Sequence, residues 1–93
     1  MAGRAAERLL ARMRVSKSGW SQGDLRRLYL GFGFEVDEGG NHTLYIHPVF
    51  PQLRATVPRH SPLPIAYANH AVKLIDELVS LEMGSEFTED ADA

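Results

Sequence analysis

The residues of this chain with the greatest chemical potential are its histidines, three of which lie between positions 42 and 60. His42 directly follows Gly39-Gly40-Asn41, and glycines let a phosphate approach the backbone closely. Imidazole exchanges protons near neutral pH, and RNA carries its own nucleophile, the ribose 2′-hydroxyl. His42 is therefore a candidate general acid or base for RNA cleavage without a metal. The spacing alone favours a simpler interpretation, a strand-end histidine that hydrogen-bonds the turn.

The positions of the other histidines argue against a metal site. Side chains alternate between the two faces of a strand, so His42 and His47, in one expected strand, point to opposite faces. His70 lies alone on the expected last helix. The chain has no cysteine, which excludes a cysteine-based zinc site and a disulfide framework. We therefore expect no metal and no cofactor.

Several charged residues could meet a phosphate backbone or assist His42. Arg59 and His60 follow the expected third strand, and an arginine offers a planar fork of donors; a solvated loop or an ion pair explains them equally well. Arg26 and Arg27 lie on an exposed helix face, where ordinary solvation is the simpler interpretation. Glu38, close to His42 in sequence, could orient it or act as an acid.

The charge of the chain is unevenly distributed. The net charge is −2, but residues 1–60 carry nine Lys and Arg against five Asp and Glu, whereas residues 61–93 carry one Lys against seven acids. A basic body with an acidic end permits a surface that faces RNA. Charge alone does not distinguish such an RNA-facing surface from a chance distribution of surface charges.

These residues need elements to hold them, and apolar residues recur at helical spacing in three segments, residues 3–14, 21–30 and 65–81. Ser21 with Asp24 is an N-cap signal for the second of these helices. Gly84 is the expected stop of the last helix. Residues 85–93 are acidic and lack a periodic apolar face, so we expect a disordered tail.

Short runs of β-branched and aromatic residues predict three strands, residues 34–36, 41–47 and 53–57. Residues 37–40 form the expected first turn, and Pro48 and Pro51 force the chain out of the second strand. Two hairpin-like connections imply a three-stranded antiparallel sheet with helices on one face, an α+β fold. At 93 residues the chain suffices for one compact domain and not two.

The sequence predicts a cytoplasmic protein without membrane contact. No apolar run approaches the roughly 20 residues that span a bilayer. The N-terminus lacks the uninterrupted apolar core of a signal peptide, because arginines recur in it at Arg4, Arg8, Arg12 and Arg14.

Three motifs, in this order, resemble the HicA (YcfA-like) family of ribonuclease toxins: GFGFE at residues 31–35, GNHTLYIHP at 40–48 and TVPRH at 56–60. The resemblance covers about residues 20–81. Gly40 and His42 match the family's glycine and catalytic histidine. Asn41 stands in the place of the usual serine, and Thr43 in that of a frequent second histidine.

The resemblance implies a fold similar to double-stranded RNA-binding domains, α-β-β-β-α, over residues 20–82, with residues 1–14 as an additional helix. It implies metal-independent cleavage of mRNA by His42 and neutralisation by a HicB antitoxin. Such domains contact phosphates and 2′-hydroxyls largely by shape. The candidate RNA-binding residues are Gly40, Asn41, Arg26, Arg27, Arg59 and His60.

Two other functions stay open. A non-catalytic RNA-binding module of the same fold is favoured by the altered Gly-Asn-His-Thr motif at residues 40–43. A protein-interaction domain that never meets RNA is favoured by the net acidity and by the apolar turn Val49-Phe50, in which an exposed phenylalanine would be unusual.

Overall fold

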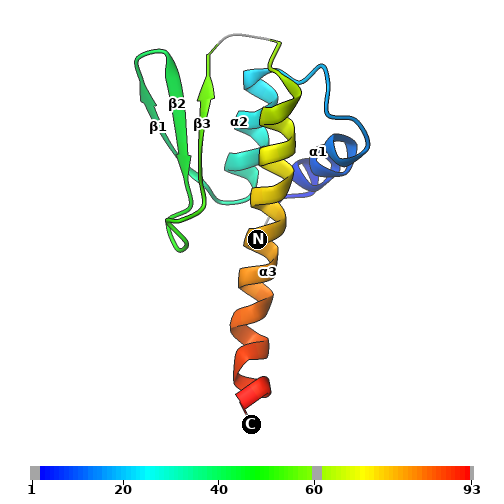
Figure 1. The fold of residues 1–93 in the computed structure, drawn as a ribbon, viewed down its shortest axis with the longest axis vertical. Helices are drawn as coiled ribbons and strands as arrows, with labels where there is room; N and C mark the ends of the chain where they lie inside the picture. Colours follow the sequence, from blue (N-terminus) through cyan, green and yellow to red (C-terminus); the bar gives the residue numbers. More distant parts are fainter. Residues whose placement is uncertain (1–2, 60–61, 93) are drawn as a thin grey trace.

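The computed structural model describes residues 3–59 and 62–92, with side chains up to Gly84. This part of the chain contains three helices and three strands, in the order α1 (Arg4–Val15), α2 (Gln22–Gly31), β1 (Glu35–Gly39), β2 (His42–Ile46), β3 (Arg54–Pro58) and α3 (Ile65–Asp92). The strands form one antiparallel sheet in the order β1-β2-β3. The predicted α+β fold is confirmed: an α-β-β-β-α arrangement with an additional N-terminal helix (Figure 1).

One face of the sheet packs against α2 and α3, and α1 lies on the far side of these helices (Figure 1). Along β2, Thr43 and Tyr45 are fully buried, whereas His42 is exposed and Leu44 and Ile46 are partly exposed. This alternation is typical of an antiparallel sheet that is covered on one face only. His42 therefore belongs to the open face, and Tyr45 to the inner face.

The start of α2 is specified by the local sequence. The Ser21 hydroxyl accepts a hydrogen bond from the Asp24 backbone N–H at 3.2 Å, and the Asp24 carboxylate accepts one from the Ser21 backbone N–H at 2.9 Å. This capping box confirms the predicted helix start. The helix ends at Gly31, and Gly33, with a φ of 90°, turns the chain towards β1.

The core lies between the sheet and the helices. Tyr29 of α2 stacks on Tyr45 of β2 with ring centroids 4.7 Å apart, and it meets Phe34 edge-on at 5.0 Å. Leu10 and Met13 of α1 belong to the same buried cluster. Because each such side chain contributes about 1.5–3 kcal/mol when buried, α1 is an integral part of the core rather than a loose extension.

Two contacts bring α1 close to its neighbours. A Cβ added at Gly31 would overlap the Cβ of Ala6, so α1 and α2 cross at a point where only a glycine fits. Near the other end of α1, Arg14 donates to both carboxylate oxygens of Asp76 on α3, at 3.0 and 2.5 Å. Packing and a bidentate ion pair together hold α1 in place.

The last helix differs from its prediction. The predicted stop at Gly84 is wrong, because α3 continues to Asp92; a glycine inside a helix costs only about 1 kcal/mol, and no proline follows it. The helix thereby includes residues 85–92 of the tail that the sequence predicts to be disordered. Val79, which lies within the predicted helix 65–81, is 39% exposed. No helix among the described residues, α3 included, is long and apolar enough to cross a membrane.

The first hairpin is tighter than predicted. Residues 37–39, expected in a turn, extend β1 and pair with β2, so that only Gly40 and Asn41 join the two strands. Pairing satisfies the backbone of these residues on one side, and this overrides their weak strand propensity.

Candidate functional site at the turn end of the sheet

His42 lies at the end of the sheet that carries the β1–β2 turn, which we call the turn end. It is the first residue of β2, its side chain is exposed, and the strand register places it in one row with Gly39 of β1 and Pro58 of β3. Gly39 has no side chain, and no described residue hydrogen-bonds the imidazole. A bound polymer can therefore reach His42 from the open face.

The turn beside His42 is held in a specific conformation. Gly40 has a φ of 38°, in the left-handed region that L-residues with a Cβ rarely adopt. The carbonyl of Asn41 accepts a hydrogen bond from the backbone N–H of Arg59 at 3.1 Å. The turn is thus tied to the segment that follows β3, and three of the predicted RNA-binding residues are brought together with His42 at the turn end.

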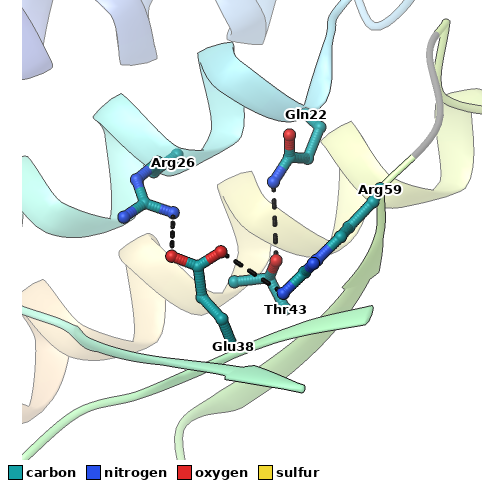
Figure 2. A network of polar contacts seen from close by, with 5 residues as sticks. All are labelled: Gln22, Arg26, Glu38, Thr43 and Arg59. Atoms are coloured by element: carbon teal, nitrogen blue, oxygen red, sulfur yellow. Dashed lines mark hydrogen bonds and ion pairs between the residues drawn. The ribbon is translucent and has the colours of Figure 1, made fainter. Parts of the chain in front are cut away.

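A polar network occupies the inner face at the same end (Figure 2). The Glu38 carboxylate accepts a hydrogen bond from Arg26 Nη1 at 3.1 Å through one oxygen and from Arg59 Nη2 at 3.3 Å through the other. These three side chains are between 37% and 46% exposed. The network joins α2, β1 and the segment after β3.

The structure does not bring Glu38 to His42. Glu38 pairs with Thr43 in the register, one position away from His42, and therefore lies on the opposite face of the sheet. Its carboxylate is engaged by Arg26 and Arg59. The idea that Glu38 orients His42 or acts with it as an acid finds no support in this geometry.

Two further polar groups lie beside the network. The amide of Gln22 donates to the buried Thr43 hydroxyl at 3.4 Å (Figure 2). The hydroxyl of Tyr45 is buried. Burial raises the pKa of Tyr45. Arg26 lowers it, by its charge and as a hydrogen-bond donor, and the charge of Glu38 raises it, so both side chains lie near this hydroxyl.

Arg27 is separated from the other predicted RNA-binding residues. Successive helix positions point about 100° apart, and Arg27 faces the α1 side, where it pairs with Asp24. His60 lies outside the described residues. Arg27 and Asp24 line a groove of about 980 Å³ between α1 and α2. Trp20, which also lines this groove, packs beneath Arg12, with the guanidinium 5.5 Å from the ring centroid.

His47 has a structural role that the sequence analysis missed. Its side chain is buried, and its Nδ1 accepts hydrogen bonds from the backbone N–H groups of Val49 and Phe50, at 3.1 and 3.3 Å. The ring also meets Phe34 edge-on and lies near Phe50. Phe50 is accordingly half-buried rather than exposed. A histidine directly before a proline at a strand end was the available signal for this turn-capping role.

The two strand histidines therefore differ as the alternation predicts: His42 is on the open face and His47 on the inner face. Within the described residues, no group of three or more His, Asp or Glu side chains could hold a metal ion. His70 lies apart on α3, where its Nε2 is 3.4 Å from the carbonyl oxygen of Arg54.

The chain was compared with protein-family models, with curated proteins and with solved structures, and it matched none of them.

Proposed function

We propose that this protein is a metal-independent endoribonuclease of the HicA toxin type, in which His42 acts as the general acid and base. The observation that carries the proposal is the position of His42: it is exposed, on the open face, beside a glycine turn and at the same end of the sheet as Arg26 and Arg59, which lie on the inner face. The natural partner of such a toxin is a HicB-like antitoxin protein, and its substrate is mRNA.

The surroundings of His42 suit a polyanion. Arg26 and Arg59 lie at the same end of the sheet with one carboxylate, Glu38, between them. Both α2 and α3 begin at this end (Figure 1), and the positive ends of helix macrodipoles favour phosphate groups. A strand of RNA that passes over the turn end can meet these charges while its ribose faces His42.

The chemistry needs one imidazole. His42 removes the proton from a ribose 2′-hydroxyl, and the resulting oxygen attacks the adjacent phosphorus in line. The bond from phosphorus to the 5′-oxygen breaks, and the imidazolium returns its proton to that oxygen. The products are a 2′,3′-cyclic phosphate and a free 5′-hydroxyl. General acid–base catalysis of this kind contributes about 10²- to 10⁴-fold to the rate.

The first prediction tests this role. We expect His42→Ala to lower the rate of RNA cleavage by about 100-fold or more, while far-ultraviolet circular dichroism and RNA binding stay unchanged, because the side chain is exposed and unpartnered among the described residues. Cleavage is measured with a labelled single-stranded RNA in the presence of EDTA.

His70→Ala is the matched control, because His70 is also exposed but lies on α3, away from the turn end. It should cleave like the wild type. Equal cleavage by wild type and His42→Ala would refute the proposed mechanism.

One observation favours a second function, a non-catalytic RNA-binding module. His42 has no described residue beside it to orient the ring, since Glu38 lies on the other face. Binding without cleavage between pH 6 and 8 would select this alternative. RNA affinity should then still fall steeply with added salt, because each phosphate contact releases counterions.

A further inference from the structure

The arrangement of Arg26 and Arg59 is that of two cationic donors which converge on one anion. They come from α2 and from the segment after β3, and each donates to a different oxygen of the Glu38 carboxylate, at 3.1 and 3.3 Å (Figure 2). Two guanidinium groups face a single negative charge, so the cluster keeps an excess of positive charge. Inorganic phosphate offers more oxygens and more charge to the same two donors than a carboxylate does. An RNA phosphodiester offers one charge on two free oxygens, and this charge is repeated along the strand.

A buried donor lies beside this cluster. The Tyr45 hydroxyl is fully buried, which raises its pKa, and Arg26 lies close enough to lower that pKa both by its charge and as a hydrogen-bond donor. The charges of Arg26 and Glu38 both act on the Tyr45 ring, which places it next to the network. A small anion between the two arginines would bring acceptor oxygens towards this hydroxyl.

The Glu38 side chain can move away from the two arginines. It lies on β1, an edge strand, next to the turn, and its side chain is 46% exposed. Exposed ion pairs of this kind are weak and are screened by salt. A ligand with greater charge can therefore displace the carboxylate without disturbing the core.

We propose that Arg26 and Arg59 form a binding site for a phosphate group, which the Glu38 carboxylate occupies as an internal competitor in the absence of ligand. As a contact for the phosphodiester backbone of RNA, the site rests on the proposed function; as a site for a phosphate group, it does not. Glu38 then lowers the affinity of the turn end for polyanions.

The test measures the binding of inorganic phosphate by NMR titration of the wild type, Glu38→Gln and Glu35→Gln. Glu35 is the matched control, because it is exposed on the same strand but lies at the other end of β1 and on the open face, opposite Ile46. Both variants change the net charge equally. We expect Glu38→Gln to bind phosphate about fivefold more tightly than the wild type, since it loses its internal competitor, and Glu35→Gln to bind like the wild type.

Arg59→Gln supplies an independent readout that does not require the Glu38 variant to fold: its phosphate-dependent shifts should be lost. Equal phosphate affinities for Glu38→Gln and Glu35→Gln, or shifts that survive in Arg59→Gln, would overturn the proposal whatever the cleavage assay shows.

A second arm separates the sources of the phosphate. A short oligonucleotide whose sugars lack the 2′-hydroxyl has no nucleophile for the proposed cleavage, so it reports binding alone. Tighter binding of this oligonucleotide by Glu38→Gln, relative to Glu35→Gln, supports the site as an RNA backbone contact. Tighter binding of inorganic phosphate without a change for the oligonucleotide supports a site for free phosphate groups. If His42→Ala cleaves RNA like the wild type while phosphate binding behaves as expected, the nuclease proposal fails and the phosphate site stands.

Discussion

Two histidines of the same strand segment show how single positions divide between chemistry and structure. His42 is exposed and has no hydrogen-bond partner among the described residues, whereas His47 is buried and accepts two backbone hydrogen bonds. Their separation by an odd number of positions places them on opposite faces of the sheet. Of the two, His42 is the one accessible to a substrate, and His47 is the one that stabilises the turn after β2.

The second prediction concerns stability. His47→Ala should lower the free energy of unfolding by about 2–4 kcal/mol, because it removes a buried ring and leaves the N–H groups of Val49 and Phe50 without their acceptor. His42→Ala should change it by less than about 0.5 kcal/mol, as surface substitutions usually do. Urea denaturation of both variants measures the difference. Similar losses in the two variants would contradict the structural role of His47.

The third prediction concerns the turn. Gly40→Ala should destabilise the protein by about 1 kcal/mol, because a Cβ is strained at a φ of 38°, and it should also reduce RNA cleavage by moving His42. Gly39→Ala is the control, since Gly39 is the neighbouring glycine, has no positive φ and would meet no atom within 4 Å. The two variants are compared by thermal unfolding and by cleavage rate. A Gly39→Ala variant as unstable as Gly40→Ala would argue against the strained turn.

Among the elements, α1 is the one whose packing partners the sequence did not indicate. Its Leu10 and Met13 are part of the buried cluster, and Arg14 binds Asp76 across to α3. The crossing with α2 depends on Gly31, where a side chain would overlap Ala6. The helix is therefore positioned by shape as much as by apolar surface.

The fourth prediction follows from this crossing. A change from glycine to alanine in a helix normally stabilises it by about 0.5–1 kcal/mol. Gly31→Ala should instead destabilise the protein by about 1–3 kcal/mol, because it forces α1 away from α2. Gly23→Ala, in the first turn of the same helix, meets only the Ser21 hydroxyl at 3.8 Å and should be neutral or stabilising.

The double variant Ala6→Gly with Gly31→Ala relieves the overlap and should recover part of the lost stability. Unfolding of all these variants by urea gives the comparison. If Gly31→Ala were as stable as Gly23→Ala, the close crossing of α1 and α2 would be wrong.

Across the whole molecule, ion pairs lie both at the proposed site and away from it. The turn end carries His42, Arg26 and Arg59, whereas the ion pair of Arg14 and Asp76 joins the outer helix α1 to α3. Carboxylates thus stabilise the fold away from the proposed RNA site as well as beside it. The free energy of unfolding therefore depends on pH through carboxylates that do not take part in the proposed binding.

The fifth prediction concerns pH. The hydrogen bond from Arg14 lowers the pKa of Asp76; for Asp24, burial raises the pKa, but hydrogen bonds from Ser21 and the charge of Arg27 outweigh it. A carboxyl whose pKa is lowered by folding contributes stability above its unfolded pKa, about 4, and loses it as the pH falls through the folded value. We therefore expect the free energy of unfolding to decline below about pH 4.

Asp76→Asn should weaken this decline and lower the free energy of unfolding at pH 7. Glu77→Gln is the control and should do neither, because Glu77 is adjacent on α3 but forms no ion pair among the described residues. Urea denaturation between pH 2 and 7 measures both profiles. Identical pH profiles for wild type and Asp76→Asn would contradict this role of the ion pair.

Local features of this protein were determined by the sequence by itself. The capping box of Ser21 and Asp24, the glycine at the β1–β2 turn and the opposite faces of His42 and His47 follow from backbone geometry and from the twofold period of a strand. These depend on neighbours a few positions apart. The order of helices and strands followed from the same local periodicity.

Only the tertiary structure decided which groups meet. It brought Glu38 to Arg26 and Arg59 instead of to His42, and it packed α1 into the core through Gly31. Each of these depends on strand register and helix packing between residues that are distant in sequence, and a shift of register by one position exchanges the faces of every side chain in a strand. Patterns along the chain cannot specify that choice, because it is made by the elements packing against one another.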